Sequence, residues 1–400
     1  MMKEGWKYKK LGDVCDVING LWTGKKEPFV TVAVIRNTNF SKDCKLRLKD
    51  VAFIEVEAKQ FASRKLQNGD IIVEKSGGSE KQPVGRPILF DLTEGDYSFS
   101  NFTSTLRIKD RQKIDSNFLQ KCLYAYYVNG ETLKMQSKTT GLHNLNMKQY
   151  LRLLIPNIPL LEQKRIVKEL DLLSGIIEKQ KQQLKELDTF AQSIFYDMFG
   201  DPVTNEKGWR YEKLNDLCLS VIRGPFGSAL KKEYFVLPSK DTYKVYEQKH
   251  AIQKDYRIGV YYIDEERFKK LRRFEVFTGD IIMSCSGTIG EFYEIPEEAE
   301  KGVINQALLK FQLALSKFDK TYFLFVMNFV KNHFDTKGTG LQNIGSVNII
   351  KNTLIAVPPL PLQNLFASKI EAIENQKADI TKSIEETQKL FDYTMDKYFG

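Results

Sequence analysis

The chain has 400 residues, a length that predicts two or three domains at about 150 residues per domain. Hydrophobic residues make up 42% and charged residues 28% of the sequence, a composition that excludes a wholly disordered, collagen-like or fibrous protein. With 60 Lys and Arg against 51 Asp and Glu, the formal net charge is +9. This basic balance favours a polyanionic partner, with nucleic acid ahead of a membrane surface.

The cysteines and the N-terminus indicate where the protein works. The 5 cysteines are widely spaced and form no C-x-x-C motif, which argues against a disulfide framework or a cysteine zinc cluster and fits a reducing compartment. The first ten residues contain no apolar run of the kind found in signal peptides. The most apolar stretch, 322–330, has about half the length that a membrane span needs. We therefore expect a cytoplasmic protein that does not enter a membrane.

The first predicted domain covers residues 1–155. Runs rich in β-branched residues at 31–35 and 70–73 predict strands, and the apolar spacing over 116–127 predicts a helix. Glycine clusters such as the one at 76–79 predict turns between these elements. The mixture is typical of an α/β globular domain.

The next segment, residues 156–204, predicts one long helix. Apolar residues recur at alternating steps of four and three over more than four heptads, which is the pattern of a coiled-coil seam. Pro156 and Pro159 stand just before this run, where proline is tolerated, and no proline lies inside it. The seam residues are Ile166, Leu170, Leu173, Ile177, Leu184, Leu187 and Ile194.

Both segments recur about 200 residues later. Gly69-Asp70-Ile71-Ile72 returns as Gly279-Asp280-Ile281-Ile282, and Thr140-Gly141-Leu142 returns as Thr339-Gly340-Leu341. Because several such matches follow in the same order, they predict a second α/β domain over 205–355 and a second helix over 356–400. Strands are expected at 280–283 and 307–313, and a helix at 320–330. The second seam consists of Ile370, Ile373, Ile380, Ile384 and Phe391, and it is weaker because Lys377, Thr387 and Thr394 interrupt it.

These segments predict a fold of the mixed α/β (α+β) class, a tandem repeat of two globular domains separated by two long helices. The first helix leads from the first domain to the second, and the second helix starts at the second domain. If the helices pack together they must therefore run antiparallel, as a coiled coil with pseudo-two-fold symmetry. The alternative is that each helix packs on its own domain.

The charge is not spread evenly along the chain. Residues 1–155 carry a net charge of +9 and residues 205–355 carry +4, whereas each helical segment carries −2. Two basic domains on a spacer suit two contacts with one extended polyanion. A membrane-binding amphipathic helix would instead carry its basic excess on the helix itself, so this reading loses support.

Few groups in the sequence are suited to catalysis. The 3 histidines are isolated from one another, which argues against a histidine metal site or a catalytic triad. The glycines at 20–26 resemble a phosphate loop that is one residue short and lacks the Ser or Thr for Mg²⁺. Asp50, Glu57 and Lys59 resemble a nuclease motif, but the second half has no counterpart. We expect no catalytic residue, no metal and no cofactor in this chain.

Two sets of loops contain residues suited to DNA, because Arg, Lys and Asn can bind base edges while Lys and Thr can bind phosphates. In the first half the candidates are Lys25, Lys26, Arg36, Asn37, Asn39, Lys75, Arg86, Lys138 and Thr139. In the second half they are Arg223, Lys231, Lys232, Arg272, Arg273, Ser286, Lys337 and Thr339.

The doubled arrangement of domain and helix resembles the specificity subunit of a Type I restriction–modification system. The resemblance covers the whole chain and is carried by the two Gly-Asp-Ile-Ile segments, the two Thr-Gly-Leu segments, and the segment from Ile158 to Gln163 that opens the first helix. It implies two target-recognition domains, each of which reads one half of a bipartite sequence in double-stranded DNA.

The resemblance also implies partners. The helices would set the spacer between the half-sites and dock two methyltransferase (modification) subunits, through which restriction (translocase) subunits join. S-adenosylmethionine and ATP would belong to those partners, so this chain would not be an enzyme. A different class of function is a structural scaffold that binds protein or RNA through its basic domains.

Overall fold

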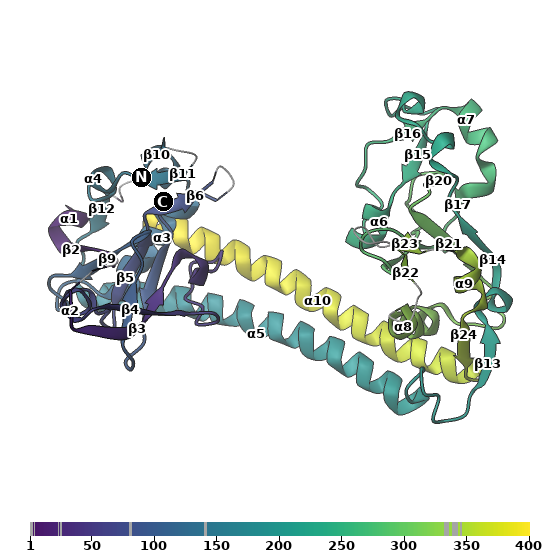
Figure 1. The fold of residues 1–400 in the computed structure, drawn as a ribbon, viewed down its shortest axis with the longest axis horizontal. Coiled ribbons are helices and arrows are strands. Elements are labelled where there is room, and N and C mark those ends of the chain that lie inside the picture. Colours follow the sequence, from purple (N-terminus) through teal and green to yellow (C-terminus); the bar gives the residue numbers. More distant parts are fainter. Residues whose placement is uncertain are drawn as a thin grey trace. The chain divides into compact units, whose positions relative to one another are not determined.

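The computed structural model describes residues 3, 5–22, 24, 26–79, 82–139, 142–331, 336–337, 343–344 and 346–400. The chain forms two compact units, one made of Met1–Lys181 with Thr381–Gly400 and the other of Gln182–Ile380. Each unit combines one mixed helix and sheet domain with parts of both long helices (Figure 1). Because each helix contributes to both units, the units differ from a simple division into two successive halves.

The first unit is built on short sheets, most of whose strand pairs are antiparallel. Its central sheet has the order β2-β9-β5-β7, with strands Cys15–Asn19, Thr103–Ile108, Asp70–Glu74 and Pro87–Phe90. Its second sheet has the order β4-β3-β8, with strands Ala52–Glu57, Phe29–Ile35 and Tyr97–Phe99, and β3 and β8 are parallel. Two smaller sheets pair β1 (Tyr8–Lys10) with β12 (Leu154–Pro156), and β10 (Gln136–Thr139) with β11 (Leu142–Leu145) and β6 (Ser76–Gly78). The helices and turns are α1 (Leu11–Val14), η1 (Asn37–Asn39), α2 (Ala58–Arg64), α3 (Ser116–Val128), η2 (Glu131–Met135) and α4 (Met147–Tyr150).

The second unit repeats this order of elements. Its central sheet is β14-β21-β18-β19, with strands Cys218–Arg223, Leu308–Leu313, Ile281–Ser284 and Phe292–Glu294. Its second sheet is β16-β15-β20-β17, with strands Tyr262–Ile263, Tyr243–Tyr246, Gly302–Ile304 and Glu275–Val276, and β15 and β20 are parallel. The smaller sheets pair β13 (Arg210–Lys213) with β24 (Leu354–Val357), and β22 (Thr336–Lys337) with β23 (Asn343–Ile344). The helices and turns are η3 (Leu214–Leu217), η4 (Gly227–Ala229), η5 (Lys232–Tyr234), α6 (Gln248–Gln253), α7 (Glu265–Lys270), η6 (Arg272–Phe274), α8 (Lys320–Val330) and α9 (Val347–Asn352).

The repeated Gly-Asp-Ile-Ile segment builds the same turn in both units. Gly69 and Gly279 adopt φ angles of +87° and +82°, which favour glycine because an L side chain is strained there. The carboxylate of Asp70 accepts a hydrogen bond from the backbone N–H of Gln67 at 2.8 Å and pairs with Arg107 at 2.7 Å. The carboxylate of Asp280 accepts a hydrogen bond from the backbone N–H of Phe277 at 2.9 Å and forms an ion pair with Lys310 at 3.1 Å. In both units the aspartate therefore links the turn to the neighbouring strand of the central sheet.

The long helices are α5 (Leu160–Phe199) and α10 (Leu360–Phe399), and they pack together antiparallel in each unit. In the first unit Gln180 of α5 donates to the hydroxyl of Ser383 of α10 at 2.7 Å, and in the second Asp188 pairs with Lys377 at 2.8 Å. All twelve predicted seam positions are buried or half-buried. The predicted interruption at Lys377 is accommodated because its ammonium pairs with Asp188 and, at 2.9 Å, with Glu374 at the edge of the seam.

The ends of the long helices also pack on the globular domains, so both predicted arrangements occur along the same helices. At the start of α5, buried Gln163 accepts a hydrogen bond from the N–H of Asp115 at 2.9 Å and donates to the carbonyl of Lys113 at 2.7 Å. At the start of α10, buried Gln363 accepts from the N–H of Asp319 at 2.8 Å. These glutamines tie each long helix to the first turn of α3 or α8.

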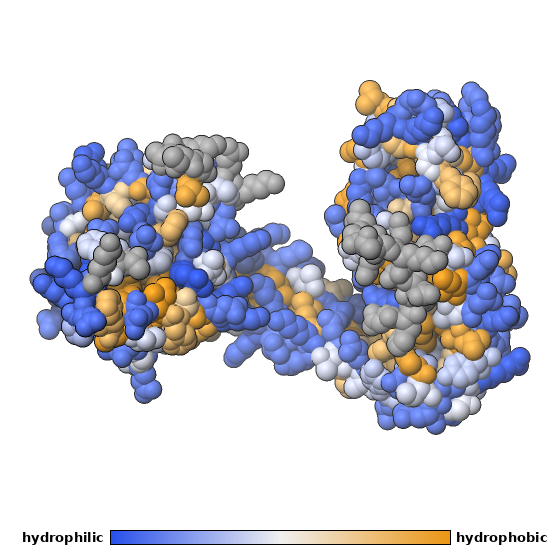
Figure 2. Space-filling view, in the orientation of Figure 1, coloured by the Kyte–Doolittle hydropathy of each residue, from blue (hydrophilic) through white to orange (hydrophobic). Residues whose placement is uncertain are grey.

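Hydrophobic side chains form the buried cores of each unit. On the face shown in Figure 2, hydrophilic residues cover much of the surface, with hydrophobic areas between them. Within the residues that the structure describes, no helix has the length and apolar character that a membrane crossing requires.

Candidate nucleic-acid interface

One edge of the central sheet in the first unit gathers several loops. Because β2 and β5 both pair antiparallel with β9, the register places Asn19 opposite Ser104 and Glu74 opposite Thr103, so β2 and β5 end where β9 begins. The carbonyl oxygen of Phe102 accepts hydrogen bonds from the N–H groups of Lys75 at 2.9 Å and Ser76 at 3.0 Å. We call this edge, formed by residues 20–22, 36–39, 75–78 and 100–102, the first loop end.

Three of the predicted DNA-contact segments meet at the first loop end. The side-chain amide of Asn37 donates to the carbonyl of Ser76 at 3.5 Å. Strand β6 follows Lys75 and pairs with β11, which in turn pairs with β10. The backbone of Lys138 and Thr139, which lie in β10, is thereby joined to the Lys75 loop, although their side chains fall outside the described part of the structure.

Two predicted contacts, Arg86 and Asn39, are instead interior residues. The side chain of Arg86 is 5% exposed, and that of its partner Glu74 is 2% exposed. Two guanidinium nitrogens of Arg86 donate to the Glu74 carboxylate oxygens, at 2.7 Å and 3.0 Å. Arg86 also donates to the carbonyl of Phe40 at 3.0 Å. The Asn39 side chain accepts from the N–H of Arg36 at 3.0 Å and donates to the carbonyl of Lys49 at 3.2 Å. Both residues shape the loop and do not face solvent.

The second unit has an equivalent edge. Register places Arg223 of β14 opposite Leu309, and Ser284 of β18 opposite Leu308. The guanidinium of Arg223 donates to the carbonyl of Gln306 at 3.1 Å, and the N–H of Cys285 donates to the carbonyl of Ala307 at 2.8 Å. We call this edge, formed by residues 223–227, 247–248, 285–287 and 305–307, the second loop end. It brings together the predicted residues Arg223 and Ser286.

Each loop end carries an amide side chain: Asn37, which the sequence predicts as a DNA contact, and Gln248, which the sequence alone did not reveal. Asn37 begins η1 directly after Arg36, the residue at the helix N-cap, and Gln248 begins α6 directly after Glu247 at the same position. Both amides lie close to a glycine loop. The amide nitrogen of Asn37 is 2.8 Å from the position that a Cβ would take on Gly77, and the amide nitrogen of Gln248 is 3.9 Å from the corresponding position on Gly287. The Oε1 of Gln248 is buried with no hydrogen-bond partner among the described residues. Asn and Gln are the side chains that can bind adenine bidentately.

The remaining predicted residues lie elsewhere or outside the described part. The N–H of Lys26 donates to Glu57 at 2.7 Å, at the end of β4. Lys231 and Lys232 are exposed beside η5, and Arg272 and Arg273 are exposed on η6, with Arg272 at 3.9 Å from Glu275. Lys25 and Thr339 lie outside the described residues, and of Lys337 only its backbone in β22 is described.

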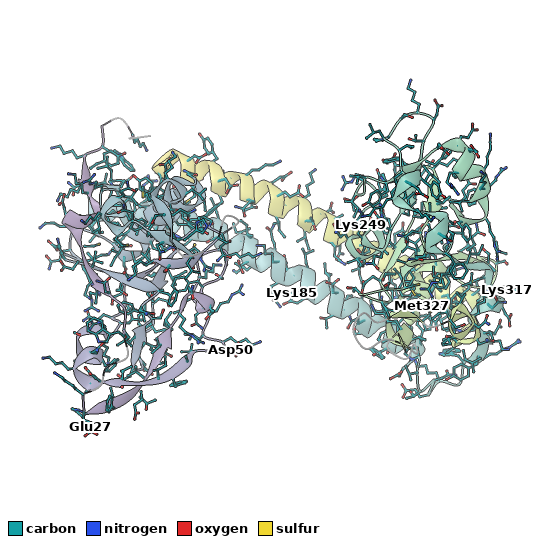
Figure 3. The ribbon with its side chains drawn as sticks, turned by 45° about the horizontal axis from the view of Figure 1, so that its top comes forward. Glu27, Asp50, Lys185, Lys249, Lys317 and Met327 are labelled. Carbon is teal, nitrogen blue, oxygen red and sulfur yellow. The ribbon has the colours of Figure 1, made fainter. Side chains whose placement is uncertain are left out.

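A buried histidine supports the second loop end. His250 of α6 is fully buried; its Nδ1 accepts from the N–H of Glu247 at 2.8 Å and its Nε2 lies 2.6 Å from the carbonyl of Ile258. Lys249, the residue before it, is labelled in Figure 3. Burial lowers the pKa of His250 below its ordinary value of 6.5, and the charge of Lys244 acts in the same direction.

This pKa shift predicts an acid-sensitive second unit. Because folded His250 resists protonation, the unfolded chain binds a proton first, and the free energy of unfolding falls as pH drops below about 6.5, by at most about 1.4 kcal/mol per pH unit. Urea unfolding at several pH values should show this loss, and His250→Gln should weaken it. NMR titration should give the ring a pKa below 6.5. Equal pH dependence in wild type and variant would contradict the prediction.

The described residues contain no group of three or more His, Cys, Asp or Glu side chains placed to hold a metal ion. Burial raises the pKa of Cys15, Cys44, Cys218 and Cys285 to about 12, so these thiols are poor nucleophiles at neutral pH.

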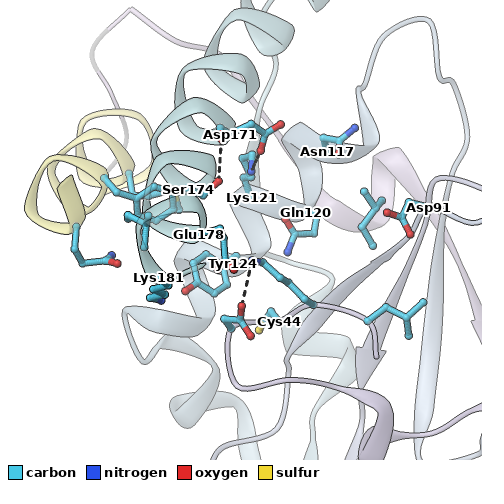
Figure 4. Close-up of a pocket in the computed structure, with 18 residues that line it drawn as sticks. Cys44, Asp91, Asn117, Gln120, Lys121, Tyr124, Asp171, Ser174, Glu178 and Lys181 are labelled. Carbon is cyan, nitrogen blue, oxygen red and sulfur yellow. Dashed lines mark hydrogen bonds and ion pairs between the residues drawn. The ribbon is translucent and has the colours of Figure 1, made fainter. Parts of the chain in front are cut away.

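The hollow shown in Figure 4 has a volume of about 510 Å³ and lies in the first unit, where α3 and residues 43–46 face the long helices. Its charges largely pair with each other, since Lys45 lies 3.1 Å from Glu178 and Lys121 lies 2.6 Å from Asp171. These ion pairs connect the domain to α5.

Comparison with known proteins identifies the family. The model of the Type I restriction modification DNA specificity domain matches residues 3–188 and again 206–389. The putative type I restriction enzyme MjaX specificity subunit of Methanocaldococcus jannaschii is 20% identical over 381 residues, 93% of this chain and 87% of that protein. The MjaVIII specificity subunit of the same organism is 22% identical over 293 residues, 68% of this chain and 67% of that protein.

Solved structures show the same fold. A chain from a structure described as "Structural basis underlying complex assembly and conformational transition of the type I R-M system" has a TM-score of 0.63 at 16% identity, covering 100% of this chain and 98% of that chain. The Type I restriction–modification S subunit from M. genitalium has a TM-score of 0.53 at 12% identity, with the same coverage of both chains. Since the family model matches both halves, this chain belongs to the Type I restriction–modification DNA specificity family, with one specificity domain in each half.

Proposed function

We propose that each globular domain of this specificity subunit reads one half of a bipartite sequence in double-stranded DNA through its loop end. The observation that carries the proposal is the presence of an equivalent loop end in both units, each with an amide side chain beside a glycine loop. The two loop ends contain different side chains at equivalent positions, for example Asn37 in the first where the second has Gln248, and Lys75 where the second has Cys285. Two different half-sites follow from this difference.

The two long helices have a separate role in this proposal. They set the spacer between the half-sites and dock two methyltransferase subunits, through which restriction subunits join the complex. Support comes from the likeness to a chain whose structure is described in terms of complex assembly of a type I system. The chain itself acts without catalysis, metal or cofactor, S-adenosylmethionine and ATP serve the partner subunits, and the complex works on DNA in the cytoplasm.

Selection of duplexes from a random DNA pool by the complex of this chain with its modification subunits tests the proposal. We expect two unlike half-sites at a fixed spacing, and an affinity that falls steeply with salt because Lys and Arg displace counterions from phosphates. Exchange of residues 1–155 for the corresponding domain of another family member should change one half-site only. A salt-independent affinity with no selected sequence would contradict the proposal and favour a scaffold.

A further inference from the structure

Each unit exposes one aromatic side chain at the same position of its loop end. Trp22 is 61% exposed and Phe226 is 89% exposed. In each unit a glycine directly follows the first strand of the central sheet: Gly20 follows β2, and Gly224 follows β14. The aromatic residue stands two positions after this glycine. The equivalent placement in both copies, although the rings differ, indicates a shared use.

The backbone holds these rings outward. A Cβ on Gly20 would lie 1.9 Å from the carbonyl oxygen of Ser100, and one on Gly224 would lie 1.9 Å from that of Asn305, so only glycine permits this close approach. The next residue in each copy, Leu21 or Pro225, is buried and anchors the loop. The residue after it therefore projects from the loop end.

Basic residues accompany both rings: one guanidinium lies over Trp22, and several basic residues lie close to Phe226 in the chain. The guanidinium of Arg64 lies 5.0 Å from the centre of the Trp22 ring and donates to the carbonyl of Asn19 at 3.0 Å. Arg223 directly precedes the Gly224 turn, and exposed Lys231 and Lys232 follow it in the chain. An exposed apolar ring alone would suit a protein partner. An exposed ring in a loop that also carries basic residues matches DNA better, because phosphates neutralise the basic side chains and bases offer flat apolar faces.

We propose that Trp22 and Phe226 each insert between neighbouring base pairs of one half-site and stack on a base there. The inference rests on the proposed function, and it adds that both domains deform the DNA that they read. Insertion of an apolar side chain unstacks one base step and kinks the duplex, so the sequence preference at that step reflects how easily it opens. The rings thereby contribute affinity without hydrogen bonds to the base edges.

The test uses the full chain in complex with its modification subunits and a duplex that carries the selected sequence. The variants are Trp22→Ala and Phe226→Ala, with Trp22→Phe and Phe226→Trp as conservative replacements. Matched controls remove exposed apolar side chains outside the segments that form the loop ends: Phe53→Ala on β4, where the ring is 74% exposed, and Leu219→Ala at the opposite end of β14, where the side chain is 77% exposed. The fluorescent base 2-aminopurine, placed at each position in turn, reports unstacking.

Wild type should raise the 2-aminopurine signal at one step in each half-site. Trp22→Ala should abolish the signal in one half-site only, Phe226→Ala in the other only, and each should weaken binding by about 5- to 150-fold. The conservative replacements and the controls should bind as wild type does. If wild type selects two half-sites but gives no such signal, the proposal that the rings insert between base pairs is wrong. The same holds if both alanine variants bind as the controls do, and in either case the proposed function stands. If wild type selects no sequence, the proposed function itself fails.

Discussion

Replacement of Arg86 by methionine is expected to lower the free energy of unfolding by about 3–5 kcal/mol. The substitution leaves the Glu74 carboxylate, whose side chain is 2% exposed, without its cation in the interior of the first unit. Glu74→Met should cost a similar amount, because it strands the buried guanidinium instead. Urea unfolding of the full chain measures both losses.

The double variant Glu74→Met/Arg86→Met separates stability from recognition. Apolar replacement of both partners restores most of the stability, since neither charge remains buried. The carbonyls of Phe40 and Asn37 nevertheless lose their guanidinium donor, at 3.0 Å and 3.4 Å, so residues 36–40 lose the support that positions the Asn37 side chain. We expect the double variant to lose selectivity for one half-site and to keep the other. Full selectivity in a stable double variant would show that Arg86 does not position this loop.

The second large effect is expected at the end of α5. Phe195 is fully buried, and its ring centre lies 5.2 Å from that of Phe329, 5.7 Å from that of Tyr322 and 5.6 Å from that of Phe366. Phe195→Ala removes a ring at which α5, α8 and α10 meet, and it should lower the free energy of unfolding of the second unit by about 3–5 kcal/mol.

Phe190→Ala is the matched control, because this ring lies on the same helix and is 54% exposed. It should change the free energy of unfolding by less than about 0.5 kcal/mol. Fluorescence of Trp209 reports the affected region, since its indole N–H donates to the carbonyl of Phe199 at 2.8 Å. Equal unfolding midpoints for the two variants would show that α5 is not anchored to the second unit through Phe195.

The long helices were the most predictable part of the fold. Their apolar spacing persists for about 40 residues, and local sequence alone then defines the helix and its buried face. The prediction did not include Phe195, which lies one position beyond Ile194 of the seam, because the buried face widens where α5 meets α8. A pattern based on one partner helix cannot include a second partner.

The loop ends were only partly predictable, because their composition depends on strand pairing. Arg86 follows a glycine and reads as a loop residue, but pairing of β5 with β7 places it beside Glu74, whose N–H donates to the Arg86 carbonyl at 3.1 Å. Gln248 reads as an ordinary polar residue, and only the packing of α6 on β18 brings it close to Gly287. A comparison of equivalent positions in the two halves could have found it, since Gln248 corresponds to Asn37.

The shared long helices have a consequence for the order in which the protein folds on the ribosome. The core of the first unit includes Ile166 and Leu170 from α5 together with Met395 and Tyr398 from α10, which are synthesised after the whole of the second unit. The second unit, Gln182–Ile380, is complete before those residues leave the exit tunnel. The unit whose synthesis begins first is therefore completed after the second unit, and its apolar face stays exposed until the last turns of α10 have emerged.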